Sequence, residues 1–152
     1  MPFSALLDAN VLVPNVLRDT LLLVAESGLY RPLWSGDILA EVRRTVLRLR
    51  PDIRPDRLDY TFSRMNEAFE GACVTGYQSI IPHMSNDDGD RHVLAAAVVG
   101  RADLIVTRNL SDFPISLWCR SSWRRRIPTS SSVISTICNQ IWWPTSSVDR
   151  AR

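Results

Sequence analysis

The sequence predicts a single α/β domain built on a parallel sheet. Three short runs, residues 3–7, 73–77 and 104–107, have the length and composition of strands, and segments with helical spacing of apolar residues separate them. Strands that alternate with helices are typical of parallel sheets. With 152 residues, 45% of them hydrophobic, the chain has the size of one well-buried core rather than of two domains.

The first strand and the first helix each have a marked end. Phe3–Leu7 is an apolar run that ends at Asp8, so we expect a buried strand with polar chemistry at its end. Asp19 and Thr20 are residue types that cap helices. Gly28 is the type that follows a helix end, which predicts a helix between these caps and Gly28.

A second helix is expected to begin at Ser35 or Asp37, which are both capping residues. Its apolar positions recur at spacings of four, four and three, which form one stripe on a helix. They are Ile38, Val42, Val46 and Leu49. Glu41 lies at the edge of this stripe. Three arginines lie away from its centre, namely Arg43, Arg44 and Arg48.

A third helix and a strand follow a loop that is bracketed by Pro51 and Pro55. This helix carries apolar residues at helical spacing, which we expect to lie in the core, and it ends at Gly71. Its apolar residues are Leu58, Phe62, Met65 and Phe69. Cys73–Tyr77 is expected to be the next strand.

The last predicted helix and strand begin after a polar segment. Asn86–Asp90 is turn-forming, and Asp90 leads into an alanine-rich helix over residues 92–100, whose small side chains allow close packing on a sheet. Leu104–Thr107 is rich in β-branched residues and predicts another buried strand.

The composition excludes several chemistries. All 18 basic residues are Arg, and without Lys neither a Walker A phosphate loop nor a lysine Schiff base can form. The three Cys are irregularly spaced, which fits neither a disulfide framework nor a zinc site. The longest apolar run, Val93–Val99, is far shorter than the roughly 20 residues of a membrane-spanning helix. Because the N-terminus lacks the pattern of a secretory signal, we expect a cytoplasmic protein with no membrane partner.

In open parallel sheets the functional residues gather in the crevice beyond the carboxyl ends of the strands, and four acidic residues are expected to face it. Asp8 follows the first predicted strand and Asp112 comes shortly after the last. Asp90, at a helix start, and Glu41 can face the same crevice. Two carboxylates about 4 Å apart repel by roughly 4 kcal/mol at an effective dielectric of 20, so such a cluster is either protonated or holds a cation. Oxygen ligands favour Mg²⁺ or Mn²⁺.

Four segments carry a resemblance to a known family. They are Leu7–Leu12, Glu41–Arg44, Asp87–Ala97 and Ile105–Pro114. In this order they resemble the motifs of PIN-domain ribonucleases, and the nearest relatives look like the VapC-like toxin components of bacterial toxin-antitoxin systems. The resemblance covers about residues 3–114. It implies a three-layer α/β/α fold, similar to a Rossmann fold, with a central parallel sheet.

The resemblance also implies a set of site residues. The metal-binding and catalytic residues would be Asp8, Glu41 and Asp90, with a more variable fourth, Asp112. The supporting residues would be Asn10, Thr107 and Asn109. The implied reaction is hydrolysis of RNA phosphodiester bonds that depends on Mg²⁺ or Mn²⁺. The implied partners are an RNA substrate and a cognate antitoxin, and by analogy with PIN toxins a second copy of the chain.

Each of the four acidic residues also has a simpler structural interpretation. Asp8 and Asp112 are turn-forming types. Glu41 is a common helix residue, and Asp90 can cap its helix, where an acid is favoured by the helix dipole. Capping and metal binding can coexist.

Other polar residues nearby are assigned structural roles. Asp87 and Asp88 are predicted to be solvated loop residues rather than ligands. His83 and His92 are not spaced as a metal pair, and His92 is expected to pack or hydrogen-bond near its helix start rather than to act as a base. The three arginines of the second helix are expected to form a solvated face, with contact to RNA phosphates as the alternative.

Two alternatives to a ribonuclease are open at this point. The first is a catalytically inactive PIN-like module that binds an antitoxin or RNA without cleaving it. The second is a metal-dependent phosphohydrolase that acts on small phosphate esters and leaves RNA intact.

Residues 115–152 differ from the PIN-like domain of residues 1–114. This tail carries six Arg against one acidic residue, holds four of the five Trp, and does not resemble the ending of the family. Codons exist for Trp118–Ser132 that, read two bases later, encode Val-Pro-Phe-Glu-Leu-Glu-Ala-Pro-His-Pro-Asp-Glu-Phe-Leu, which looks like the family's ending. We hypothesise that the tail is read out of frame, which would attenuate activity. The alternative is a basic tail that binds nucleic acid.

Overall fold

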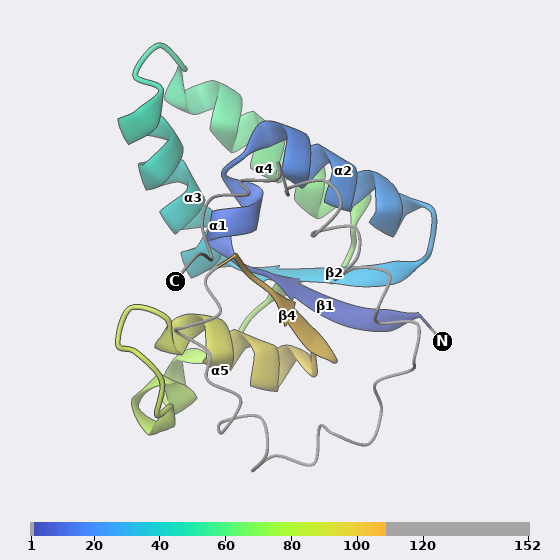
Figure 1. Ribbon diagram of the computed structural model, residues 1–152, viewed down its shortest axis with the longest axis vertical. Coiled ribbons are helices and arrows are strands. Elements are labelled where there is room, and N and C mark those ends of the chain that lie inside the picture. Colours follow the sequence, from blue (N-terminus) through green and yellow to red (C-terminus); the bar gives the residue numbers. More distant parts are fainter. Residues whose placement is uncertain (1, 109–152) are drawn as a thin grey trace, which may run out of the picture.

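Four parallel strands form the centre of the fold in the computed structural model, which describes residues 2–108 (Figure 1). The strands are β1 Phe3–Leu7, β2 Tyr30–Ser35, β3 Cys73–Val74 and β4 Leu104–Val106. They lie in the order β3-β2-β1-β4, and each neighbouring pair is parallel. The predicted parallel sheet is therefore confirmed.

Helices cover both faces of this sheet. They are α1 Ala9–Leu12, α2 Asn15–Glu26, α3 Gly36–Leu49, α4 Pro55–Ala68, the 3₁₀ helix η1 Gln78–His83, and α5 Arg91–Gly100. Figure 1 shows α1 to α4 on one face and α5 on the other, so the predicted three-layer α/β/α fold is confirmed. Within residues 2–108, no helix combines the length and apolarity needed to cross a membrane.

The register of the sheet determines which residues meet at its carboxyl edge. Leu7 of β1 pairs with Val106 of β4, so the residues that follow them, Asp8 and Thr107, emerge side by side. The strand β1 lies between β2 and β4, and Ala5, Leu6 and Leu7 are fully buried. Because helices cover both faces of β1, its continuous apolar run suits a central strand.

The helix α5 approaches the sheet closely because its residues are small. Ala95, Ala96 and Ala97 are buried, as the predicted close packing requires. At the end of the helix, a Cβ added to Gly100 would lie 2.7 Å from Cγ2 of Val74 on β3. This close approach fixes the position of α5, whose first residues lie beside the polar edge of the sheet.

The elements β2 and α1 are not evident from the sequence pattern. In β2, Arg31 and Pro32 interrupt the apolar run that indicates a strand, although the following Leu33 and Trp34 are buried. The helix α1 is a single turn, too short to display a period, and Asp8 caps it.

The predicted start of α2 is wrong. The helix begins at Asn15, with Pro14 at its N-cap, rather than at Asp19 or Thr20. The hydroxyl of Thr20 donates to the carbonyl of Val16 at 2.7 Å. It therefore bonds back along the helix, as mid-helix Ser and Thr residues do, instead of capping it.

The ends of α2 and α3 largely follow the sequence. Gly28 follows α2 with φ +81°, a left-handed conformation that favours glycine, so this prediction is confirmed. Ser35, rather than Asp37, caps α3, because its hydroxyl accepts a hydrogen bond from the backbone N–H of Ile38 at 3.2 Å. The predicted apolar stripe faces the core only as far as Val46, because Leu49 is 62% exposed. It is the last residue of α3, beyond the turns that pack on the core.

The helix α4 and the strand β3 also differ in length from their predictions. Three predicted core residues of α4 are buried, namely Leu58, Phe62 and Met65. Phe69 follows the helix end and is partly buried. The strand β3 ends at Val74 instead of Tyr77, because the chain turns at Gly76, which has φ +77°.

Candidate functional site

Asp8 stands at the point where β1 ends and α1 begins. Its backbone N–H donates to the carbonyl of Val106 at 3.1 Å, which continues the pairing of β1 with β4 by one residue. Its carboxylate accepts a hydrogen bond from the N–H of Ala9 at 2.7 Å and so caps α1. Only 4% of the residue is exposed. Its conformation is therefore determined by both a strand and a helix.

Two further side chains hold the Asp8 carboxylate. Oδ2 of Asp8 accepts hydrogen bonds from Nδ2 of Asn10 at 2.7 Å and from the hydroxyl of Thr107 at 2.8 Å. Nδ2 of Asn10 also donates to the Thr107 hydroxyl at 2.8 Å. The amide oxygen of Asn10 accepts from the backbone N–H of Arg108 at 3.0 Å, which orients the amide. The donors from Asn10, Thr107 and Ala9 together fix the position of the carboxylate.

Glu41 and Asp90 approach the same space from two other elements. Glu41 lies on α3, and its side chain is 39% exposed. Asp90 occupies the N-cap position of α5, where its backbone carbonyl accepts from the N–H of Val93 at 3.1 Å. Its carboxylate does not make the side-chain capping bond. A capping role therefore does not explain why an acidic side chain stands at this position.

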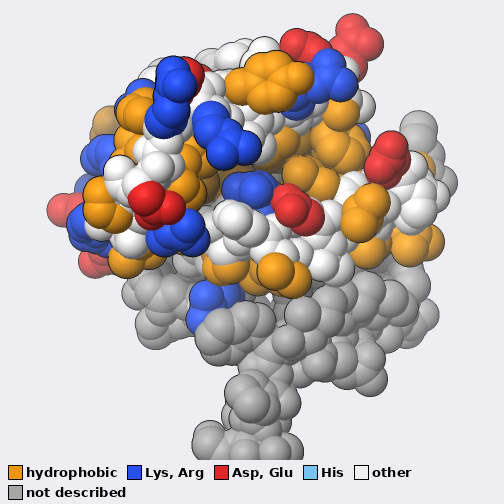
Figure 2. Space-filling model, turned by 90° about the horizontal axis from the view of Figure 1, so that it is seen from above, with side chains coloured by type: hydrophobic (Ala, Val, Ile, Leu, Met, Phe, Trp, Pro, Cys, Tyr) orange, Lys and Arg blue, Asp and Glu red, His pale blue; other side chains and the backbone are white. Residues whose placement is uncertain are grey.

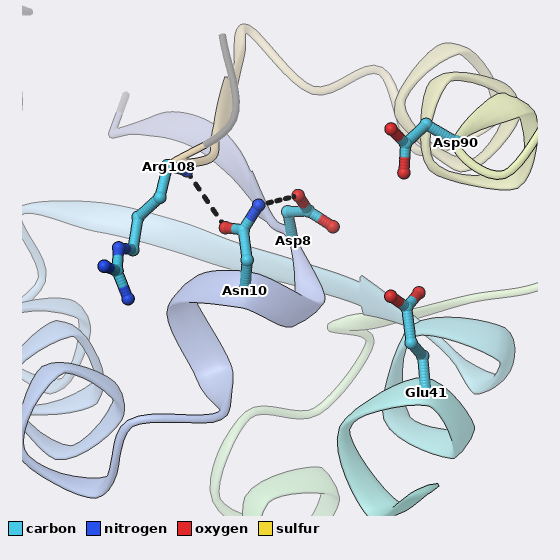
Figure 3. Close-up of a pocket in the computed structure, with 5 residues that line it drawn as sticks. All are labelled: Asp8, Asn10, Glu41, Asp90 and Arg108. Carbon is cyan, nitrogen blue, oxygen red and sulfur yellow. Dashed lines mark hydrogen bonds between the residues drawn. The ribbon is translucent and has the colours of Figure 1, made fainter. Parts of the chain in front are cut away.

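These residues line one pocket of about 380 Å³. Its lining is Asp8, Asn10, Glu41, Asp90 and Arg108. Figure 3 shows the three carboxylates facing a common space from three different elements, while the guanidinium of Arg108 points away from them. The structure thus brings together three of the four acidic residues that the sequence singled out.

The donor set of this pocket suits a hard divalent cation. It offers carboxylate and amide oxygens, which Mg²⁺ and Mn²⁺ prefer. As the side chains lie, no three Asp, Glu, His or Cys residues within residues 2–108 are gathered closely enough to chelate one ion. Mg²⁺ usually keeps several waters and binds through one or two carboxylates, so the chemistry of the pocket fits a hydrated ion better than a tight protein cage.

His92 lies against Glu41, a contact that sequence reasoning missed. Nε2 of His92 is 3.5 Å from Oε2 of Glu41 and makes no hydrogen bond among the described residues. The two residues come from α5 and α3, and helical spacing within either helix carries no signal of a contact between them. His83, in contrast, is exposed at the end of η1.

The other polar residues that the sequence singled out fall into two groups, those that the structure describes and those that it does not. Asp87 and Asp88 are exposed, as predicted, and Asp88 pairs with Arg91 at 2.7 Å. Asp87 also lines a second pocket beside the first. Asp112 and Asn109 lie outside the described residues.

The fold and the pocket together define a class of protein. A parallel sheet covered by helices on both faces, with carboxylates at its carboxyl edge, is an α/β/α domain with an acidic site at the usual functional edge. The family model described as "PIN domain" matches residues 4–111. The chain therefore belongs to the PIN-domain family.

One relative among the curated proteins comes from Mycobacterium tuberculosis and is named "Putative ribonuclease VapC50". It is 59% identical to this chain over 43 residues, which are 28% of this chain and 25% of that protein. The chain thus matches about a quarter of the length of this VapC-like relative. No solved structure matches the chain.

Proposed function

We propose that this chain is an endoribonuclease that hydrolyses RNA phosphodiester bonds with the help of Mg²⁺ or Mn²⁺. The observation that carries the proposal is the pocket into which Asp8, Glu41 and Asp90 project from three different elements. Membership of the PIN-domain family and the similarity to a protein named as a ribonuclease support the same activity.

In this proposal the three carboxylates hold the hydrated cation, and the buried Asp8 carboxylate is the one whose position is best fixed. A bound divalent ion would supply an activated water and charge to offset the negative phosphate. Asn10 and Thr107 fix the orientation of the Asp8 carboxylate, so little reorganisation is needed when the substrate arrives. Asp112 is proposed as a fourth ligand, with Asn109 as a supporting residue.

We further propose that the protein is the toxin of a toxin-antitoxin pair in the cytoplasm. The order of its motifs resembles that of VapC-like toxins, which implies a cognate antitoxin and, by analogy, a homodimer. The residues 115–152 are proposed to be an atypical tail that follows the nuclease domain.

Metal binding is tested by the thermal midpoint of the purified chain with and without millimolar Mn²⁺. Because an ion that binds the folded state stabilises it by mass action, we expect the midpoint to rise. The rise should disappear in Asp90→Asn. It should persist in Asp88→Asn, a matched control two residues away on the exposed loop. A parent chain whose midpoint does not respond to Mn²⁺ or Mg²⁺ would argue against the metal site.

Catalysis is tested with labelled RNA in the presence of Mn²⁺. We expect cleavage by the parent chain and none by Asp8→Asn. Binding of RNA or antitoxin without cleavage would favour the inactive PIN-like module instead. Turnover of a chromogenic phosphate ester with RNA left intact would favour the phosphohydrolase.

A further inference from the structure

A second pocket of about 620 Å³ adjoins the carboxylate pocket and is lined partly by arginines. Glu41 and Asp90 line both pockets, so the two share a boundary. From α3 the second pocket is lined by Glu41, Arg44, Thr45 and Arg48. Their spacing of three, four and seven residues places them on one face of the helix. The same helical face therefore changes from acidic to basic over about 10 Å.

The arginines of α3 differ in whether they have partners. Arg43 forms a two-point contact with Asp59 of α4, at 2.8 and 3.2 Å, and lowers the pKa of that carboxyl. Arg44 and Arg48 are exposed, and neither takes part in a hydrogen bond or ion pair within residues 2–108. Arg44 and Arg48, which line the second pocket, are thus the two arginines of α3 that can pair with an external anion.

The presence or absence of a carboxylate partner distinguishes Arg43, which has a structural role, from Arg44 and Arg48, which are candidates for ligand binding. Figure 2 shows basic and acidic side chains interspersed on the face that carries α2, α3 and α4. On this surface several arginines pair with nearby carboxylates, as Arg50 does with Asp52 at 2.8 Å. Two adjacent arginines without a carboxylate partner, in a pocket, are instead suited to an external anion.

We infer that Arg44 and Arg48 bind backbone phosphates of single-stranded RNA on one side of the bond that is cut. This inference rests on the proposed ribonuclease activity and extends it to the path of the substrate. The carboxylates alone would repel RNA, and the arginines offset that repulsion beside them. The planar guanidinium can contact a phosphate through two N–H groups, and the Thr45 hydroxyl is a further donor to phosphate oxygen.

The predicted recognition is independent of sequence. Contacts to phosphate set affinity and position, whereas base edges carry the sequence information. The i, i+4 spacing of the two arginines places them one helical turn apart, about 5–6 Å between Cβ atoms. Such a pair can follow a strand over a short distance without reading its bases.

The inference is tested by RNA binding without divalent cations, so that binding is measured apart from cleavage. The Kd of a fluorescent single-stranded RNA is determined for the full chain over a range of NaCl concentrations. In Arg44→Gln/Arg48→Gln we expect at least about tenfold weaker binding and a shallower salt dependence, by about 0.7 in slope for each phosphate that the variant no longer binds. The matched control is Arg57→Gln/Arg101→Gln, with the same change in charge on α4 and at the far end of α5.

Cleavage kinetics distinguish this inference from the proposed function. With Mn²⁺ present, the arginine variant should have a higher KM and a nearly unchanged kcat, because its contacts bind substrate and transition state alike. Asp8→Asn should lose kcat instead. An unchanged Kd and salt slope in the arginine variant, with an unchanged thermal midpoint, would overturn the inference whether or not the parent cleaves RNA. The inference would also be overturned if the arginine variant kept its affinity for RNA but lost affinity for an acidic polypeptide.

Discussion

The hydroxyl of Thr107 donates a 2.8 Å hydrogen bond to the carboxylate of Asp8, although the two residues are 99 positions apart in the chain. The parallel pairing of β1 with β4 makes this contact, because Leu7 and Val106 are register partners and each is followed by one of the two residues. The orientation of the proposed catalytic carboxylate therefore depends on the sheet, and this dependence can be tested.

Replacing Thr107 by Val removes the hydroxyl and keeps the branched shape. We expect RNA cleavage to fall about 10–100-fold, as is typical when a residue that orients a metal ligand is changed. The hydroxyl donates to Asp8 and accepts from Nδ2 of Asn10, so its loss removes two hydrogen bonds and should cost about 2 kcal/mol of unfolding free energy. Cleavage assays and urea denaturation measure the two effects. Thr107→Ser keeps the donor and should retain most activity; equal losses in both variants would argue against the hydrogen bond.

Glu41→Gln keeps the size of the side chain and removes its charge. If Glu41 helps to hold the cation, the rise in thermal midpoint with Mn²⁺ should shrink and cleavage should fall by about a hundredfold or more. Glu70→Gln is the control, since Glu70 follows α4 and does not line the carboxylate pocket. Full activity in Glu41→Gln would remove Glu41 from the site.

Gly100→Ala is predicted to destabilise the fold despite the better helix propensity of alanine. The added Cβ would lie 2.7 Å from Cγ2 of Val74, a stiff side chain on β3. Overpacking of this kind typically costs about 1–3 kcal/mol, against a propensity gain of about 1 kcal/mol. Gly36→Ala is the control, because a Cβ there meets nothing within 4 Å. Urea denaturation should show a loss of stability in the first variant alone.

Tyr77 is expected to make the fold sensitive to alkaline pH. Burial raises the pKa of its hydroxyl above 10.0, and the hydroxyl donates to Oδ2 of Asp37 at 2.7 Å. Since the folded pKa is raised, this contribution to stability is complete below about pH 10 and is lost as the pH rises through the raised value. The unfolding free energy should therefore fall in this range, by at most about 1.4 kcal/mol per pH unit.

Tyr77→Phe isolates this contribution. The variant should be less stable at neutral pH by about 1 kcal/mol, because it cannot form the hydrogen bond to Asp37. The difference in stability between parent and variant should then narrow above pH 10. Denaturation series from pH 8 to pH 11 measure it; a constant difference across that range would contradict the assignment.

The parts of the fold that the sequence predicted are those with a strong local pattern. The run Phe3–Leu7 has the continuous apolar character of a strand covered on both faces, and Ala5, Leu6 and Leu7 lie in the core. The first three apolar residues of the α3 stripe have helical spacing and are buried as well. In β2 the pairing to β1 on one side and to β3 on the other compensates for Arg31 and Pro32, a long-range effect that no local pattern displays.

The site was predictable as a set of residues but not as an arrangement. Asp8, Asn10 and Thr107 could be named from motifs, whereas their hydrogen-bonded triangle depends on the register of two strands. The contact of His92 with Glu41 depends likewise on how α5 packs against the sheet. The out-of-frame hypothesis for residues 115–152 stays a prediction, which sequencing the gene through these codons tests. Codons that do not permit the shifted reading would contradict it.

The order of the hydrogen-bonding partners along the chain also affects when the network can form during synthesis. Asp8 and Asn10 are made early, but Thr107 and the N–H of Arg108 are added only when the last described strand has been translated. Until then the Asp8 carboxylate lacks the Thr107 donor, and the Asn10 amide lacks the contact that orients it. In the proposed ribonuclease, the hydrogen-bond network around Asp8 can therefore be complete only after β4 and the two residues that follow it have been made.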